Sequence, residues 1–226
     1  MKKLFCNTLN RDQMGIIVGS LLGDGSIPKK MRGTGNHYLD ITHSYKQYDY
    51  LLYKKNIFES YGFKCSGPYK RTVSGKYIEY SLHIYYKSEP KIFNTLRHWF
   101  YHTGKKYFTH NMLKWLTPLG IAIWYMDDGS RAIHYNKGSK KIKARELHIA
   151  TYDLSENERK VLHNYFRKYN IEMKQYKDRD KFRTNLNSSN AKKFIELIKK
   201  FICPSMLYKI DLQYPTNMTP TGILIG

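Results

Sequence analysis

The chain has 226 residues, which is enough for one large domain or two smaller ones, and 41% of them are apolar, which is ample for a buried core. No stretch approaches the roughly 18 to 20 uncharged apolar residues of a membrane span, and the first residues lack a signal-peptide pattern. The cysteines Cys6, Cys65 and Cys203 lie far apart, which argues against a disulfide framework or a zinc site. We therefore expect an intracellular globular protein of a bacterial or phage cytoplasm or an organelle matrix, without a membrane partner.

The net charge of +21 indicates a polyanionic partner, because self-repulsion on this scale opposes compaction. Lysines and arginines recur along the whole chain, interleaved with 21 tyrosines, whereas a polybasic membrane-surface protein concentrates its charge in one tail or helix. Nucleic acid is the expected partner. The alternative is a basic surface that only confers solubility.

The first predicted element is a helix over the apolar run of residues 14–25. Asn10 and Gln13 precede it at the spacing of a capping box. Gly15, Gly19 and Gly23 fall on one face of this helix, although each costs about 1 kcal/mol relative to alanine. Such a cost predicts that another helix packs closely against the glycine face.

Alternating apolar and polar residues predict strands over residues 38–44, 77–86, 146–151 and 182–186. Between the strands, Gly62 and Asn170 suit the left-handed exits of helices. Each half of the chain then has the order αββαββα. This order predicts an α+β fold with antiparallel sheets covered by helices on one side, and with the other face available to DNA.

A second apolar run over residues 119–129 begins after Thr117 and Pro118, which suit a helix cap and a first helical turn. Its small residues Gly120 and Ala122 make it the expected partner of the first glycine face. Further on, Ser155 and Glu158 have the spacing of a capping box.

The two halves look like copies of one unit, because both apolar runs end in Asp-Gly and the two aspartates, Asp24 and Asp128, lie 104 positions apart. Lys106 and Lys209, after the later helices, lie 103 positions apart. We predict two domains, residues 1–110 and 111–226.

An aspartate is disfavoured at the negatively polarised end of a helix, and convergence of Asp24 and Asp128 about a pseudo-two-fold axis would add repulsion. A divalent cation removes both costs, and oxygen ligands favour a hard ion such as Mg²⁺. The competing interpretation is a turn in which Asp precedes Gly.

Residues 17–25 and 121–129 resemble the nine-residue signature of the LAGLIDADG homing endonucleases, in their two-motif, monomeric, intron-encoded form. The similarity extends over residues 10 to 215. It implies that the two motif helices pack at the centre and that a long asymmetric site in double-stranded DNA is cut with Mg²⁺ or Mn²⁺. The family cuts across the minor groove and leaves short 3′ overhangs.

By position, the resemblance implies that Asp24 and Asp128 bind the catalytic metal, with Gly23 and Asp127 beside them. Asp127 stands in the alanine place of the motif, where it either tunes the site or is a solvated helix end. Lys106 and Lys209 are the implied basic residues near the scissile phosphates. Lys105 competes with Lys106, and each lysine has a solvated surface position as its alternative.

Sequence recognition in this family comes from the exposed faces and turns of the sheets, and most basic side chains there contact phosphates. Asp40 and His148 are weaker candidates for the surroundings of the metal. The expected DNA-contacting residues are Lys29, Lys30, Arg32, Lys70, Arg71 and Lys76 in the first half and Arg131, Lys137, Lys140, Lys141, Lys143, Lys177, Arg179, Lys181 and Arg183 in the second.

Two other functions remain open. A maturase would bind its intron RNA and assist splicing, and a non-catalytic DNA-binding regulator would use the same helices. Both classes tend to lose a catalytic aspartate, so the presence of Asp24 and Asp128 together favours cleavage. A phosphate-binding P-loop is excluded because no Gly-Lys-Ser/Thr follows the glycines.

Overall fold

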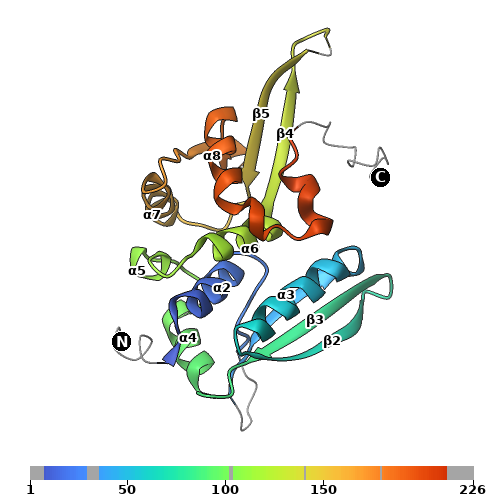
Figure 1. Cartoon of the computed structure of the whole chain (residues 1–226), viewed down its shortest axis with the longest axis vertical. Helices are drawn as coiled ribbons and strands as arrows, with labels where there is room; N and C mark the ends of the chain where they lie inside the picture. The colour runs from blue at the N-terminus through green and yellow to red at the C-terminus, as the bar shows by residue number, and fades with distance from the viewer. Residues whose placement is uncertain (1–7, 30–35, 102–103, 140, 179, 213–226) are drawn as a thin grey trace. The chain divides into compact units, whose positions relative to one another are not determined.

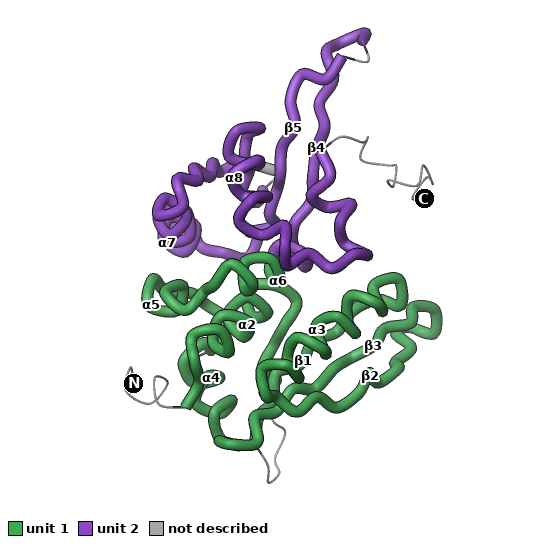
Figure 2. Tube along the Cα trace, viewed as in Figure 1, with its two compact units in different colours: residues 1–124 green, residues 125–226 purple. Residues whose placement is uncertain are grey.

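A computed structural model describes residues 8–29, 36–101, 104–139, 141–178 and 180–212 of the chain (Figure 1). The chain divides into two compact units, Met1–Trp124 and Tyr125–Gly226 (Figure 2). The division falls inside the helix formed by the second apolar run, so this helix begins in the first unit and carries its acidic end into the second. Within the described residues, no helix has the length and apolar character needed to cross a membrane.

The first unit combines a three-stranded antiparallel sheet, in the order β1-β3-β2, with helices. Helix α3 lies along one face of the sheet (Figure 1). The elements are α2 (Arg11–Leu22), β1 (Leu39–Ser44), the 3-10 turn η1 (Tyr45–Gln47), α3 (Tyr48–Ser60), β2 (Lys64–Val73), β3 (Tyr77–Tyr85), α4 (Ile92–Phe100), α5 (His110–Leu113) and the start of α6 (Pro118–Asp128).

The second unit has a four-stranded antiparallel sheet in the order β4-β5-β7-β6, and α8 packs on β5 and β7. Strand β5 begins four residues before the predicted start, because the β4–β5 hairpin continues as a paired ladder to Tyr135 and Ile142. The elements are β4 (Gly129–Tyr135), β5 (Ile142–Ile149), α7 (Glu156–Arg167), β6 (Lys174–Asp178), β7 (Lys181–Leu186), α8 (Ser188–Ile198), η2 (Lys199–Phe201) and η3 (Pro204–Lys209).

The predicted helix starts are confirmed. Asn10 and Gln13 form a complete capping box on α2, and Ser155 and Glu158 form another on α7. The Thr117 hydroxyl accepts a 3.3 Å hydrogen bond from the Gly120 amide, three residues into α6. Three polar side chains thus fix where these helices begin by satisfying amides that have no partner inside the helix.

The two helix exits are also confirmed and match in detail. Gly62 after α3 and Asn170 after α7 have positive φ angles of 82° and 54°. The next residue in each case, Phe63 or Ile171, donates its amide to the carbonyl of Phe58 or Phe166 five positions earlier. Both helices therefore end in the same Schellman-type turn, at a sequence offset of 108.

The order αββαββα is complete in the second unit, but in the first the partner strand of β1 is reduced to a single bridge. Ser26 and Asp40 exchange both main-chain hydrogen bonds, at 2.8 and 2.7 Å. The next hydrogen-bonded pair of an antiparallel ladder would need the amide of residue 28, and Pro28 has none. The ladder consequently stops within the described part of this segment.

The glycine face of α2 packs against the first turns of α6, as predicted. A Cβ atom at Gly19 would overlap the carbonyl of Gly120, and one at Gly120 would overlap the carbonyl of Gly15. A Cβ at Gly15 would overlap the side chain of Thr117. The two helix backbones are thus in direct contact, and only glycine fits at the crossing.

Candidate active site and nucleic-acid interface

Asp24 lies directly beyond α2, because Gly23 ends the helix and the chain turns back. The amide of Gly23 still bonds to the carbonyl of Gly19 at 3.2 Å, and the amide of Gly25 bonds to Ser20 at 2.7 Å. A Cβ at Gly25 would stand 2.6 Å from the Ser20 carbonyl, so the residue after Asp24 must be glycine for this turn. The Asp24 side chain is 41% exposed and is presented at the surface of the first unit.

His43 lies beside Asp24 and was not predicted from the sequence. Its Nδ1 atom is 3.4 Å from Oδ2 of Asp24 and 3.2 Å from Oε1 of Gln47, while its Nε2 atom is 3.0 Å from Nζ of Lys54. His43 and Lys54 are both buried. The available signal was the position of His43 in β1, where it continues the buried register of Leu39 and Ile41.

Lys106 approaches the end of α2 from the segment that follows α4. Its ammonium donates hydrogen bonds to the carbonyls of Gly23, at 3.1 Å, and Gly25, at 3.0 Å. These carbonyls flank Asp24. Lys105, the competing residue, is exposed. Of the two lysines, the geometry favours Lys106 as the basic residue of this centre.

The second unit repeats this arrangement at Asp128. Lys209 is buried, and its ammonium donates to the carbonyls of Met126 and, at 3.1 Å, Asp127. Its own carbonyl accepts a 2.9 Å hydrogen bond from the hydroxyl of Tyr125. Asp128 is half-buried at the last position of α6, and its carbonyl accepts the amide of Ala150 at 3.0 Å. Each motif aspartate is thus preceded by a carbonyl that a lysine holds.

The donor set of each centre suits a hard divalent ion. Asp24 offers a half-exposed carboxylate beside His43, and Asp128 offers a half-buried one at the last position of α6. The main-chain carbonyls next to each aspartate accept hydrogen bonds from Lys106 or Lys209. Mg²⁺ and Mn²⁺ prefer such oxygen ligands. The carboxylates of Asp24 and Asp128 are therefore candidate ion ligands, one in each unit.

The face of the first sheet opposite α3 is here called outer face 1. Side chains alternate along each strand, and this alternation shows which of the predicted DNA contacts lie on outer face 1. Cys65, on the helix side, bonds to the Lys55 carbonyl of α3, whereas Arg71 pairs across the ladder with Glu79 on outer face 1. Arg71 and Glu79 also form a 2.8 Å ion pair. Lys70, one residue earlier, points to the helix side. Lys29 and Lys76 are exposed outside the strands.

The corresponding outer face 2 of the second sheet lies opposite α7 and α8. His163 of α7 is 3.2 Å from the Thr184 hydroxyl, which fixes the helix side. Lys181 and Arg183 alternate with Thr184 and lie on outer face 2, and the Arg183 guanidinium stands 5.1 Å from the Tyr176 ring centroid. Lys174, which pairs with Asn185 on outer face 2, was not predicted.

Other predicted contacts are placed differently. Lys137 and Lys141 are exposed at the β4–β5 turn, and Lys143 lies at the register shift of the β4–β5 ladder. Lys177 alternates toward the helix side of its strand. Arg131 is 8% exposed and donates to the main-chain carbonyl of Asp211, which favours a structural role. The predicted contacts Lys30, Arg32, Lys140 and Arg179 lie outside the described residues.

A polar network occupies the end of outer face 2 nearest to Asp128. Oε2 of Glu146 is 3.3 Å from Nε2 of His134 and of His148, and it accepts a 2.9 Å hydrogen bond from Asn185. Burial alone would raise the pKa of Glu146, but the bonds to Asn185 and the histidines lower it. Burial also lowers the pKa of His148, against the opposing effect of Glu146. Convergence of three groups on one oxygen favours a hydrogen-bond network over an ion site.

Asp40 and His148, the weaker candidates, occupy matching positions. Asp40 pairs with Ser26 and His148 pairs with Ser130, the second residue after each motif aspartate. Burial raises the pKa of Asp40, and the nearby His83 and Arg71 oppose this only in part. Asp40 therefore lies at the end of outer face 1 that is nearest to Asp24, and His148 lies at the end of outer face 2 that is nearest to Asp128.

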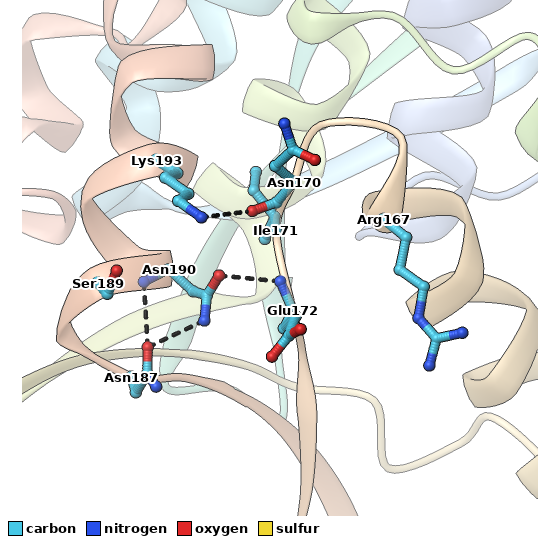
Figure 3. Close-up of a pocket in the computed structure, with 8 residues that line it drawn as sticks. All are labelled: Arg167, Asn170, Ile171, Glu172, Asn187, Ser189, Asn190 and Lys193. Atoms are coloured by element: carbon cyan, nitrogen blue, oxygen red, sulfur yellow. Dashed lines mark hydrogen bonds between the residues drawn. The ribbon is translucent and has the colours of Figure 1, made fainter.

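A surface pocket of about 740 Å³ in the second unit has a structural role instead (Figure 3). Lys193 of α8 donates to the Asn170 carbonyl at 2.8 Å, and the Glu172 amide donates to Asn190 at 2.9 Å. Asn187 caps α8 by accepting the Asn190 amide. These bonds tie the exit of α7 to the start of α8.

Comparison with known proteins identifies a family. The sequence model of the LAGLIDADG DNA endonuclease family matches residues 14–194. The structure of the homing endonuclease I-WcaI bound to its DNA recognition sequence superposes with a TM-score of 0.73 at 26% identity, covering 92% of this chain and 89% of that one.

Curated relatives carry two further names. The cytochrome b mRNA maturase bI2 of Debaryomyces hansenii is 30% identical in an alignment that covers 91% of this chain and 76% of the maturase. The RecA protein of Mycobacterium leprae is 28% identical in an alignment that covers 96% of this chain but 31% of that protein. The chain thus spans about a third of this RecA and about half of other RecA relatives.

Proposed function

This chain belongs to the LAGLIDADG DNA endonuclease family, and we propose from that membership that it cuts both strands of a long asymmetric DNA site. The observation that carries the proposal is the same construction at both motif ends. Asp24 and Asp128 each follow a carbonyl that is held by a lysine, Lys106 or Lys209. An aspartate and a lysine at each centre suit phosphodiester hydrolysis. Membership of the family implies that this hydrolysis depends on a metal ion.

In this proposal Asp24 and Asp128 hold Mg²⁺ or Mn²⁺, with the Gly23 and Asp127 positions beside them. A bound divalent ion supplies Lewis acidity at the phosphate and a more acidic water. Lys106 and Lys209 bring a positive charge to the main-chain carbonyls next to each aspartate, where it would offset the charge that develops on the phosphate. Because one chain carries both centres, a monomer suffices for a double-strand cut with short 3′ overhangs.

Outer faces 1 and 2 supply the DNA-binding surface in this proposal. I-WcaI, which covers nearly the whole chain in superposition, is bound to its recognition sequence. The strongly positive chain would neutralise phosphates through Arg71, Lys181 and Arg183, while the histidines and tyrosines of the same faces reach base edges. An organelle matrix or a bacterial cytoplasm provides such DNA without a membrane barrier.

The decisive experiment is selection of cleaved sequences from a randomised double-stranded library with Mg²⁺. Asp24→Asn and Asp128→Asn are then assayed on the selected site. We expect wild type to cut it and both variants to lose cleavage while they still bind. Cleavage at the wild-type rate by both variants, or by wild type in chelator, would contradict the proposal.

A second candidate function is assistance to intron splicing, and the 30% identical maturase relative favours it. A maturase would bind its intron RNA in preference to DNA. Splicing of the intron that surrounds or adjoins the gene, measured with and without the protein, separates the two activities. The carboxylate variants should leave splicing intact, because they change only the proposed cleavage chemistry.

A further inference from the structure

The Asp24 centre contains a lysine that lies entirely inside the protein. Lys54, in the middle of α3, has no exposed surface, and its ammonium stands 3.0 Å from Nε2 of His43 and 4.6 Å from the Tyr50 ring centroid. Burying an ammonium costs several kcal/mol before its partners compensate. Packing alone does not explain a buried lysine at this position, and its neighbours point to a function for Lys54.

The direction of the hydrogen bonds follows from the chemistry of the ammonium. It has no lone pair, so Lys54 donates and Nε2 of His43 accepts. The imidazole is then neutral and carries its proton on Nδ1. That N–H faces Oδ2 of Asp24, at 3.4 Å, and Oε1 of Gln47, at 3.2 Å. Lys54 thus sets the tautomer that lets His43 donate toward the carboxylate.

The second unit shows that the fold does not need this pair. The offset of 108 that relates the two helix exits places Leu162 at the position of Lys54 and Thr151 at that of His43. Leu162 is 1% exposed and Thr151 is 2% exposed, and the Thr151 hydroxyl lies 3.3 Å from that of Thr184. A leucine therefore fills the same helix position at no electrostatic cost.

We propose that Lys54 and His43 are positioning residues for Asp24 and make the two cleavage centres unequal. His43 orients the carboxylate toward its ion, and Lys54 holds His43 in the donating tautomer. This rests on the proposed function. Groups that hydrogen-bond to a metal-binding side chain change metal affinity or activity by roughly 10- to 100-fold when they are removed.

The main test variant is Lys54→Leu, which copies the residue of the second unit. Lys55→Leu is the matched control, because it removes the same charge from the same helix at a partly exposed position. On a selected site labelled separately in each strand, we expect Lys54→Leu to slow one strand about tenfold or more. That strand should be the one slowed by Lys106→Met, and Lys55→Leu should leave both rates near those of wild type.

Two measurements on the free protein do not depend on cleavage. Long-range ¹H–¹⁵N spectra should show His43 protonated on Nδ1, and Lys54→Leu should shift this equilibrium. Titration with Mn²⁺, followed by the spin resonance of the free ion, should show about tenfold weaker binding in Lys54→Leu. Equal Mn²⁺ affinity, or strand rates that are unchanged or equally reduced, would overturn the inference.

If Lys54→Leu does not fold, the pair His43→Asn and His43→Leu replaces it. Asparagine keeps a donor near the Nδ1 position and should retain most Mn²⁺ affinity, whereas leucine should lose it. Equal losses in the two variants would also overturn the inference. Absence of cleavage by wild type on any DNA, with the Mn²⁺ difference present, would instead contradict the proposed function alone.

Discussion

The ammonium of Lys106 donates a 3.1 Å hydrogen bond to the carbonyl of Gly23, the residue before Asp24. Lys209 does the same at the carbonyl of Asp127, again at 3.1 Å, before Asp128. The two lysines come from segments of different structure, a loop in the first unit and the 3-10 helix η3 in the second. What the two lysines share is therefore a hydrogen bond to the carbonyl of the residue before the motif aspartate.

Lys106→Met should reduce cleavage of one strand by about 10²-fold, as expected for the loss of one preorganised charge near the phosphate. Binding of DNA should change little. The measurement is single-turnover cleavage with each strand labelled. Lys105→Met is the control, since it removes a neighbouring charge that is exposed, and a larger effect of this control would reverse the assignment.

Gly19→Ala should destabilise the first unit, because the added Cβ would overlap the Gly120 carbonyl and neither backbone can yield without moving a helix. Overpacking of this kind costs about 1 to 3 kcal/mol or more. The measurement is the free energy of unfolding in urea. Asn56→Ala, exposed in the middle of α3, is the control and should be neutral or slightly stabilising. Stabilisation by Gly19→Ala would show that the helices do not touch there.

DNA binding should weaken steeply with salt, since contacts to several phosphates release counterions. Removing one phosphate-contacting side chain should reduce the slope of log K against log salt by about one. Lys181→Gln on outer face 2 tests this, and Glu172→Gln at the structural pocket, which also changes one charge, is the control. A salt response that is flat for wild type would argue against this interface.

Acid should destabilise the second unit through His148 and Glu146, whose pKa values are both lowered in the fold. A lowered pKa means that the unfolded chain takes up protons first, so stability is present above the unfolded pKa and is lost as the pH falls. For His148 the loss begins near about pH 6.5, and for Glu146 near about pH 4.3.

The check is the free energy of unfolding measured from about pH 8 to about pH 2, so that the range extends well below both unfolded pKa values. His148→Asn should flatten the upper part of the decline, and Glu146→Gln should flatten the lower part. His110→Asn, at an exposed histidine, should follow wild type. A rise in stability on acidification would contradict the assigned directions.

Local chemistry explains which parts of the fold were predictable. Asn10, Ser155, Gly62 and Asn170 act through their own neighbours, so sequence spacing alone fixed the helix boundaries. That the described residues before β1 form only one bridge could not be predicted without the register of the ladder, which decides whether the absent amide of Pro28 matters.

Candidate site residues could be predicted from the sequence only where the same residue type recurs in both halves of the chain. Asp24 with Asp128 and Lys106 with Lys209 were proposed because each has a counterpart at nearly the same offset. His43 and Lys54 were missed because their counterparts are Thr151 and Leu162. The burial of Arg131 and its bond to the Asp211 carbonyl could not be predicted, since composition cannot tell which face of a strand a basic residue occupies.

The direct connection between α6 and β4 bears on how accurately the protein would select its DNA site. Strand β4 begins at the residue after Asp128, and the Asp128 carbonyl is bonded to Ala150, just after β5. No flexible linker separates the strands that would read the target from the carboxylate that would cut it. Under the proposed function, a DNA sequence that prevents outer face 2 from entering the groove would also keep the scissile phosphate away from Asp128. Discrimination against wrong sites would then act on the rate of cleavage as well as on affinity.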